Sequence, residues 1–145
     1  MIKKAEIRGS SSLAYMAVVM WQDSSISELE KEFKEIIHND NAAVFIKYVD
    51  EDPIGFAQCQ LRFDYVESTE TSPVGYLEGI FILEEYRHKG YAKELLNTCE
   101  KWAKDKNCLE FASDCELDNY NSYKFHMAVG FTEANRIICF KKHIE

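Results

Sequence analysis

The chain has 145 residues, 46% of them apolar, which is enough for one compact domain with a sizeable core. Seventeen Lys and Arg residues against 25 Asp and Glu residues give a formal net charge of -8. This acidic balance argues against general nucleic-acid binding and suits a cationic partner. The longest early apolar run, residues 13–21, is too short to cross a membrane, so we expect no membrane association.

The cysteine pattern argues against both a disulfide framework and a metal site. The number of cysteines is odd, none forms a CxxC pair, and none has zinc-ligand spacing with a histidine. We therefore expect no metal, and reduced, mostly buried thiols in a cytoplasmic chain whose N-terminus lacks a signal-peptide core. The cysteines are Cys59, Cys99, Cys108, Cys115 and Cys139.

The first half of the chain predicts a strand, two helices and a β-hairpin. Ser27-Glu28-Leu29-Glu30 matches a capping box and predicts the start of the second helix, which ends at Asn39. The polar turn at residues 50–53 joins the two strands of the hairpin. The predicted strands of this half are residues 2–8, 42–49 and 54–63, and its first helix is residues 13–21. A polar loop over residues 64–72 follows.

Residues 74–106 form the most informative stretch. An apolar run over residues 74–83 has the composition of a buried strand, and a helical period begins at Tyr91. Between them, Arg87-His88-Lys89-Gly90 makes a basic turn that opens the helix. Free backbone N–H groups and the macrodipole make a helix N-terminus attractive to anions, and Gly90 permits close approach. The turn therefore predicts a phosphate site; the alternative is a solvated connection, and neither the P-loop nor the dinucleotide spacing is present.

The last part of the chain predicts two more strands around a helix. The strands are residues 109–113 and 137–141, and the helix, residues 121–129, is stopped by Gly130. The element order is then β-α-α-β-β-β-α-β-α-β in a single domain, residues 1–145. This order predicts an α/β fold (an α+β mixed sheet) with helices on both faces.

Two carboxylates occupy unusual positions in this plan. Glu78 interrupts an apolar strand, and Asp114 follows the C-terminal end of another strand. Ligands of open α/β sheets bind at such strand ends, and an unpaired buried carboxylate is costly. A cationic ligand would compensate for that cost. The alternative is that each carboxylate is neutralised by a structural Arg or Lys, or is exposed.

Two motifs resemble the signatures of the GNAT acyl-CoA-dependent N-acetyltransferases. They are Arg87-x-x-Gly90-x-Ala92 and Asn119-x-x-Ser122-x-x-Phe125-His126-x-x-x-Gly130-Phe131. Further segments resemble the aminoglycoside 6′-N-acetyltransferases within that superfamily. These segments are Asp64-Tyr65-Val66, Leu77-Glu78-Gly79-Ile80-Phe81, Ala112-Ser113-Asp114 and Gly130-Phe131, with Trp21 at the end of the first helix.

The resemblance implies the GNAT fold and acetyl-CoA as cosubstrate, without a metal. It implies acetyl transfer to the 6′-amine of an aminoglycoside antibiotic, and therefore resistance, by a cytoplasmic homodimer. Asn135 stands where the family often has a second substrate-binding carboxylate, and Ser24 where it often has a histidine. The implied coenzyme contacts are the backbone of Ile80, Phe81 and Ile82, the turn of His88, Lys89, Gly90, Tyr91, Ala92 and Lys93, and Asn119. The implied substrate-binding residues are Trp21, Tyr65, Glu78, Asp114 and Asn135.

Acyl transfer to an amine requires that the amine lose its proton, so we expect Glu78 and Asp114 to be catalytic. Gly79 inside a strand indicates a bulge that frees N–H groups to stabilise the oxyanion. His126 is either a proton donor or a structural helix residue, and Cys115 is more simply a packed thiol than an acyl carrier. Trp21 and Tyr65 are otherwise ordinary core aromatics. The alternatives for function are acetylation of another amine, such as a polyamine or a peptide N-terminus, and a silent acyl-CoA-binding module.

Overall fold

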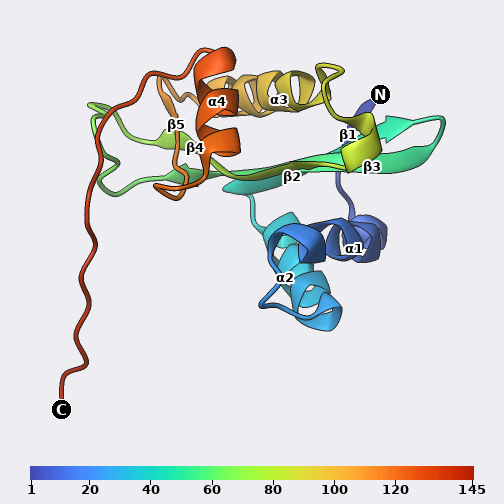
Figure 1. The fold of residues 1–145 in the computed structure, drawn as a ribbon, viewed down its shortest axis with the longest axis horizontal. Helices are drawn as coiled ribbons and strands as arrows, with labels where there is room; N and C mark the ends of the chain where they lie inside the picture. Colours follow the sequence, from blue (N-terminus) through green and yellow to red (C-terminus); the bar gives the residue numbers. More distant parts are fainter.

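The computed structural model describes residues 1–145 as a five-stranded sheet with helices on both faces (Figure 1). The strands lie in chain order, antiparallel except for the parallel pair β4 and β5, so the predicted mixed sheet is confirmed. The strands are β1 (Ile2–Lys4), β2 (Ala42–Val49), β3 (Asp52–Arg62), β4 (Val74–Ile82) and β5 (Phe111–Ser113). The helices are α1 (Ser10–Met20), α2 (Ile26–His38), α3 (Tyr91–Asp105) and α4 (Tyr120–Ala128), with 3-10 turns at Ile7–Gly9 and Glu84–Tyr86. No helix has the length and apolar content needed to cross a membrane.

The sheet separates two hydrophobic cores, because successive side chains of a strand point to opposite faces. On one face, α1 and α2 pack against Val44, Ile46 and Phe56. On the other face, α3 packs Leu95, Leu96 and Cys99 against a second set of strand residues. Figure 1 shows the two layers, with α1 and α2 on one side of the sheet and α3 and α4 on the other. The strand residues on the α3 side are Ala43, Phe45, Ile54, Ala57, Cys59, Leu77 and Ile82.

Three predicted element boundaries near the N-terminus need correction. The first helix begins at Ser10, three residues before the predicted start. The first strand ends at Lys4, and Arg8 lies in the 3-10 turn that leads into α1. The N-cap of α2 is Ser25 and not Ser27, because the hydroxyl of Ser25 accepts a hydrogen bond from the N–H of Glu28 at 3.2 Å. Both serines have a glutamate three residues later, so the capping-box pattern fits either residue.

A β-bulge at Glu78 interrupts the pairing of β3 with β4. Gln58 faces Gly79 and Cys59 faces Leu77, which leaves Glu78 without a partner residue. The bulge reverses the alternation of β4: Leu77 before it and Ile80 after it both pack into the α3 core. Glu78 and Gly79 therefore lie consecutively on the α1 and α2 side. The bulge predicted from Gly79 is confirmed.

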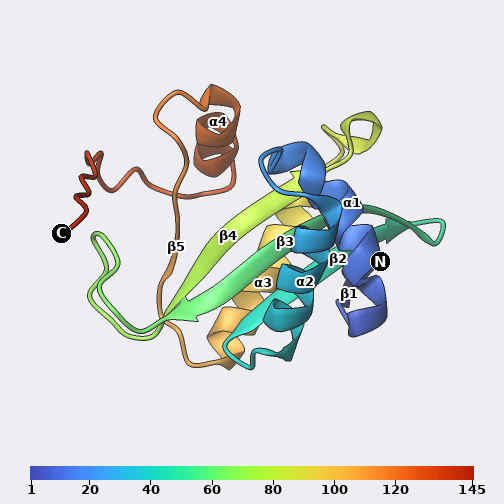
Figure 2. The ribbon, with the colours of Figure 1, turned by 90° about the horizontal axis from the view of Figure 1, so that it is seen from below.

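Beyond the bulge, one edge of β4 is open. The strand β5 pairs with β4 only from Gly75 to Leu77 and then leaves it, as Figure 2 shows. The N–H of Leu83 donates to the carbonyl of Ile54 at 2.8 Å, toward β3. Because N–H groups alternate between the two edges of a strand, those of Ile80 and Ile82 point to the open edge.

The predicted last strand, residues 137–141, is wrong for this chain. Residues 132–145 extend away from the sheet and pair with no strand (Figure 1). Ile137, Ile138 and Phe140 are 66% to 89% exposed. The composition is that of a strand, but a strand also needs hydrogen bonds to a neighbouring strand, and this segment makes none within its own chain.

We expect Ser25→Ala to lower the free energy of unfolding by about 1 kcal/mol, because α2 loses its N-cap acceptor. Ser27→Ala is the matched control, since its hydroxyl contacts only that of Ser25, and we expect a change within about 0.5 kcal/mol. Urea unfolding of both variants measures the difference. Equal losses would contradict the assignment of Ser25 as the cap.

Candidate functional site

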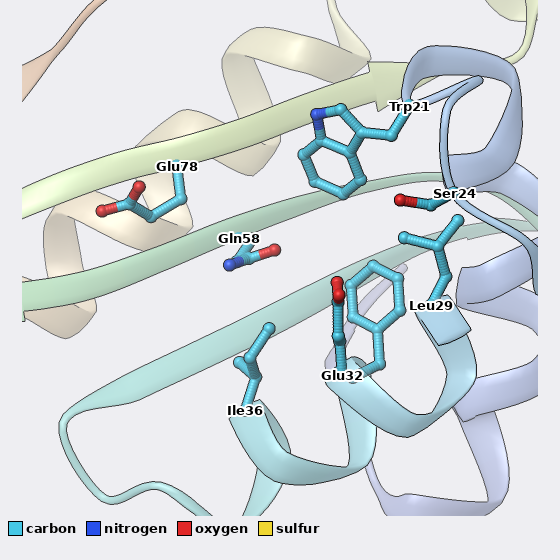
Figure 3. Close-up of a pocket in the computed structure, with 8 residues that line it drawn as sticks. Trp21, Ser24, Leu29, Glu32, Ile36, Gln58 and Glu78 are labelled. Carbon is cyan, nitrogen blue, oxygen red and sulfur yellow. The ribbon is translucent and has the colours of Figure 1, made fainter. Parts of the chain in front are cut away.

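A cavity of about 230 Å³ lies on the α1 and α2 side of the sheet, directly over the bulge. Figure 3 shows Trp21 and Ser24 at one end, Glu78 at the other and Gln58 between them. A second hollow of about 380 Å³ continues along α2 past Glu35 and Gln60. It shares Glu32, Ile36 and Gln58 with the first. The first cavity is lined by Trp21, Ser24, Leu29, Glu32, Phe33, Ile36, Gln58 and Glu78.

Trp21 is both a core residue and the wall of this cavity. It caps the C-terminus of α1, where its N–H donates to Ala17 at 2.8 Å. Its ring packs 6.4 Å from that of Phe33 and 6.2 Å from that of Phe56, measured between centroids. A Cβ on Gly79 would lie 2.9 Å from the indole, so only glycine lets Trp21 lie on the strand here. Trp21 therefore packs against the core and also lines the cavity, and its role in substrate binding stays a prediction.

Glu78 is paired with a basic residue that the sequence analysis did not single out. The guanidinium of Arg62, the last residue of β3, donates three hydrogen bonds to Glu78: Nε and Nη2 to Oε1 at 3.1 and 2.8 Å, and Nη2 to Oε2 at 3.1 Å. The side chains are 37% and 21% exposed, so the pair is partly buried. The alternative reading of Glu78, neutralisation by a structural arginine, is therefore confirmed.

Asp114 is connected to the same pair through Tyr76. The hydroxyl of Tyr76 donates a hydrogen bond to a carboxylate oxygen of Asp114, and the guanidinium of Arg62 lies 3.4 Å from the centroid of the Tyr76 ring. Burial, and then the bond to Asp114, raise the pKa of Tyr76 well above its usual range. Tyr76 therefore stays protonated and remains a donor. Asp114 itself is exposed, and its charge has no cationic partner.

Tyr65 and Asn135 meet in a separate cluster around Glu67, which the sequence analysis did not identify. Tyr65 donates its hydroxyl proton to Oε2 of Glu67 at 2.8 Å, and the side-chain amide of Asn135 donates to Oε1 at 2.9 Å. These bonds, that from Asn135 first, lower the pKa of Glu67. Neither Tyr65 nor Asn135 lines the cavity at Trp21, and Tyr65 is an exposed loop residue rather than a core aromatic.

The basic turn before α3 has the geometry of an anion site. His88 and Gly90 are in the left-handed region, with φ of 63° and 84°, and no atom lies within 4 Å of where a Cβ on Gly90 would be. The backbone at the helix N-terminus is thus open to a ligand. Arg87 ties the turn to β4 through a 2.8 Å bond to the carbonyl of Ile82. Tyr91, Ala92 and Lys93 form the first turn of α3.

The start of α3 is fixed to the sheet by a partly buried ion pair. Lys47 of β2 contacts Glu94 at 2.8 Å and lies 4.7 Å from the centroid of the Tyr91 ring. The hydrogen bond to Glu94 raises the pKa of Lys47, so Lys47 stays charged. The turn that opens α3 is therefore held at a defined place relative to the sheet.

His126 has a structural geometry. Its Nδ1 lies 2.6 Å from the carbonyl of Ser122 and donates to it, and its Nε2 lies 2.8 Å from the hydroxyl of Ser113. The ring thus holds α4 against β5. Asn119 caps α4 by accepting from the N–H of Ser122 at 3.1 Å. Cys115 is exposed, so the expectation of a packed thiol is wrong there, whereas Cys59, Cys99 and Cys108 are buried and free.

Comparisons with known proteins agree with the geometry. The family model described as "Acetyltransferase (GNAT) family" matches residues 11–131. Aminoglycoside N(6′)-acetyltransferase type 1 of Acinetobacter haemolyticus is 40% identical over 126 residues, covering 87% of this chain and 86% of that protein. The protein of the same name from Salmonella typhimurium is 43% identical over 109 residues, 75% of each chain.

Solved structures give the same result. The structure of AAC(6′)-Iy in complex with the bisubstrate analogue CoA-S-monomethyl-acetylneamine has a TM-score of 0.95 and 34% identity, covering 99% of this chain and 98% of that one. The aminoglycoside 6′-N-acetyltransferase AAC(6′)-Ih of Acinetobacter baumannii has a TM-score of 0.94 and 37% identity, covering 100% and 99% of the two chains.

We expect Gly79→Ala to destabilise the protein by about 1–3 kcal/mol, because the added methyl group meets the indole of Trp21. The tryptophan emission should shift as the ring moves. Gly9→Ala is the control, since the same methyl group there meets only a side-chain carbon of Ile46 at 3.4 Å. Thermal unfolding with fluorescence detection measures both effects. An unchanged emission spectrum in Gly79→Ala would contradict the close packing of Trp21 on β4.

Proposed function

The chain belongs to the acetyltransferase (GNAT) family, and we propose on that basis that it transfers the acetyl group of acetyl-CoA to the 6′-amine of aminoglycoside antibiotics and so confers resistance to them. The observation that carries the proposal is the cavity between Trp21 and Glu78. The cavity lies on one face of the bulged strand β4. The open backbone edge of the same strand is the proposed binding site of acetyl-CoA, the other substrate. Two substrates that meet across one strand can react directly, without a covalent enzyme intermediate.

Acetyl-CoA is proposed to bind along the open edge of β4 and at the N-terminus of α3. The N–H groups of Ile80 and Ile82, and the backbone of Phe81 between them, would hold the pantetheine arm. The N–H groups from His88 to Lys93 would hold the pyrophosphate, with Lys89 adding charge. The side-chain oxygen of Asn119 is occupied as the α4 cap, which leaves its amide hydrogens for the coenzyme.

The acceptor amine is proposed to enter from the Trp21 side. An alkyl ammonium has a pKa of about 10.4, so a carboxylate must attract it and receive its proton, directly or through water. Glu78 and Asp114 supply that charge. The neutral amine then attacks the thioester carbon, and the oxyanion is stabilised by N–H groups of β4. The attacking nitrogen loses its second proton, the bond from carbon to sulfur breaks, and CoA leaves as a thiolate that takes up that proton.

The remaining candidates have smaller roles in this mechanism. A free thiol has a pKa of about 8.5, so the leaving thiolate needs no strong acid, and His126 already uses both ring nitrogens in structural bonds. Trp21 offers an apolar, cation-attracting face to a sugar ring. Tyr65 and Asn135, joined by Glu67, are proposed as an outer contact for further amines of the antibiotic.

We propose that the enzyme is a cytoplasmic homodimer. The C-terminal segment exposes Ile137, Ile138 and Phe140, which is costly for a monomer in water. The outer edge of β5 is unpaired. A second copy would satisfy both, with the C-terminal segment of one chain pairing with the sheet of the other. The free buried thiols are consistent with a reducing compartment.

We expect Gly90→Asp to weaken acetyl-CoA binding at least about tenfold, because a side chain and a negative charge then occupy the phosphate position. Gly130→Asp is the matched control: Gly130 also has positive φ, 100°, and nothing within 4 Å, but lies after the C-terminus of α4. Calorimetry of the folded variants measures the affinity. An unchanged affinity in Gly90→Asp would contradict the site.

The main test uses kanamycin or tobramycin, which carry a 6′-amine, against an analogue with a 6′-hydroxyl. We expect acetylation of the amines only. Glu78→Gln should lower kcat/KM by roughly 10²-fold, as loss of a general base does, with acetyl-CoA binding nearly intact. Asp114→Asn should mainly raise KM.

If the wild type acetylates neither drug, the proposed substrate is wrong and another amine becomes the leading reading. If it acetylates both and Glu78→Gln is as fast as wild type, the function stands and the role of Glu78 does not.

A further inference from the structure

Arg62 stands at the end of a polar row on β3. Ala57 and Cys59 of β3 pack on α3. Because side chains alternate along a strand, those of Gln58, Gln60 and Arg62 lie on the opposite face, toward α2. Gln58 lies in the cavity and Gln60 in the adjoining hollow. Arg62 closes the row, and its side chain reaches across to β4.

The guanidinium of Arg62 is held on two sides. Its edge donates three hydrogen bonds to Glu78, and its face stacks 3.4 Å from the centroid of Tyr76. A fork to a carboxylate and a stack on an aromatic ring together fix the plane of an arginine, which a lysine cannot reproduce. The orientation of the Glu78 carboxylate is therefore set by a residue outside the cavity.

The three bonds also limit what Glu78 can still accept. A carboxylate has about four acceptor sites, two on each oxygen. Arg62 uses two on Oε1 and one on Oε2. One acceptor site remains, and it is on Oε2.

An arginine beside this carboxylate reduces its attraction for a cationic substrate, so attraction alone does not explain the pair. The pair is partly buried, and the desolvation of its two charges offsets their attraction, so stability is a weak explanation as well. Orientation explains both the fork and the stack, because an amine must approach the thioester within a narrow range of directions.

We propose that Arg62 is a positioning residue for the acceptor amine, which it directs to the single free acceptor site on Oε2 of Glu78. This inference rests on the proposed function. The ammonium group, or the water that carries its proton, binds at that site. Without Arg62 the carboxylate can turn and offers further acceptor sites, so the amine is still bound but is held in unproductive directions.

The test is steady-state kinetics of the full-length enzyme with acetyl-CoA and kanamycin. We expect Arg62→Met to lower kcat at least about tenfold while KM changes less than about threefold, since misplacement affects the reaction more than binding. Arg62→Lys, which keeps the charge and loses the fork, should lower kcat at least about threefold. In a Glu78→Gln background, Arg62→Met should cause no more than about a twofold further loss, because the two residues act as one unit.

Arg8→Met is the matched control, because Arg8 also pairs with a carboxylate, that of Glu6 at 3.2 Å, but on the exposed N-terminal segment. Its kcat should equal that of wild type. Thermal unfolding and acetyl-CoA affinity are measured for every variant. If Arg62→Met does not fold, Arg62→Lys decides the question, since wild-type kcat in that variant would overturn the inference.

Three other results would also overturn it: wild-type kcat in a folded Arg62→Met, a raised KM with unchanged kcat, or an equal loss with and without Glu78. The last result would indicate that Arg62 acts through Tyr76 and Asp114 and not through Glu78. Absence of turnover by the wild type is a different failure, because it overturns the proposed function itself and this inference with it.

Discussion

The bulge at Glu78 is the constraint on which the site depends. In a regular strand, neighbouring residues face opposite sides, so either Glu78 or Gly79 would point into the α3 core. The extra residue places both on the side of α1 and α2. Glu78 brings a carboxylate to the cavity without burying it among apolar side chains, and Gly79 gives Trp21 a flat surface to lie on. The same strand then presents free N–H groups at its other edge, where β5 has already diverged.

The electrostatics of the site depend on which of its carboxylates have a cationic partner. Glu78 has Arg62, whereas Asp114 has only the hydroxyl of Tyr76, a neutral donor. Glu32 and Glu35 line the hollows along α2 and form no ion pair. The negative charge of the site is therefore unevenly distributed. The carboxylate at the bulge is compensated by an arginine, and the carboxylates on either side of the bulge have no cationic partner. A substrate with several amines meets both environments at once.

Local patterns predicted most of the fold. Strand β2 was predicted to the residue, and the start of α3 at Tyr91 was correct, because alternation and helical spacing depend only on neighbours in sequence. The partner of Glu78 was missed because it depends on the register between β3 and β4, which a bulge shifts. A search for a basic residue on the same face of the preceding strand would have found Arg62. The cluster around Glu67 was missed because residues in loops have no regular spacing in the sequence from which their contacts could be predicted. The last strand was mispredicted because composition cannot state whether a partner edge exists in the same chain.

The packing of Trp21 on Gly79 bears on how drug range can evolve. A larger residue at Gly79 meets the indole, and a smaller one at Trp21 removes core contacts with Phe33 and Phe56, so both positions are closed to gradual change. Ser24 and Glu32 line the same cavity from the end of the α1–α2 connection and from α2, and neither is buried. Selection under a new antibiotic would therefore act through α2 and the connection before it. The bulged strand would stay fixed while the opposite wall of the cavity diverges between lineages.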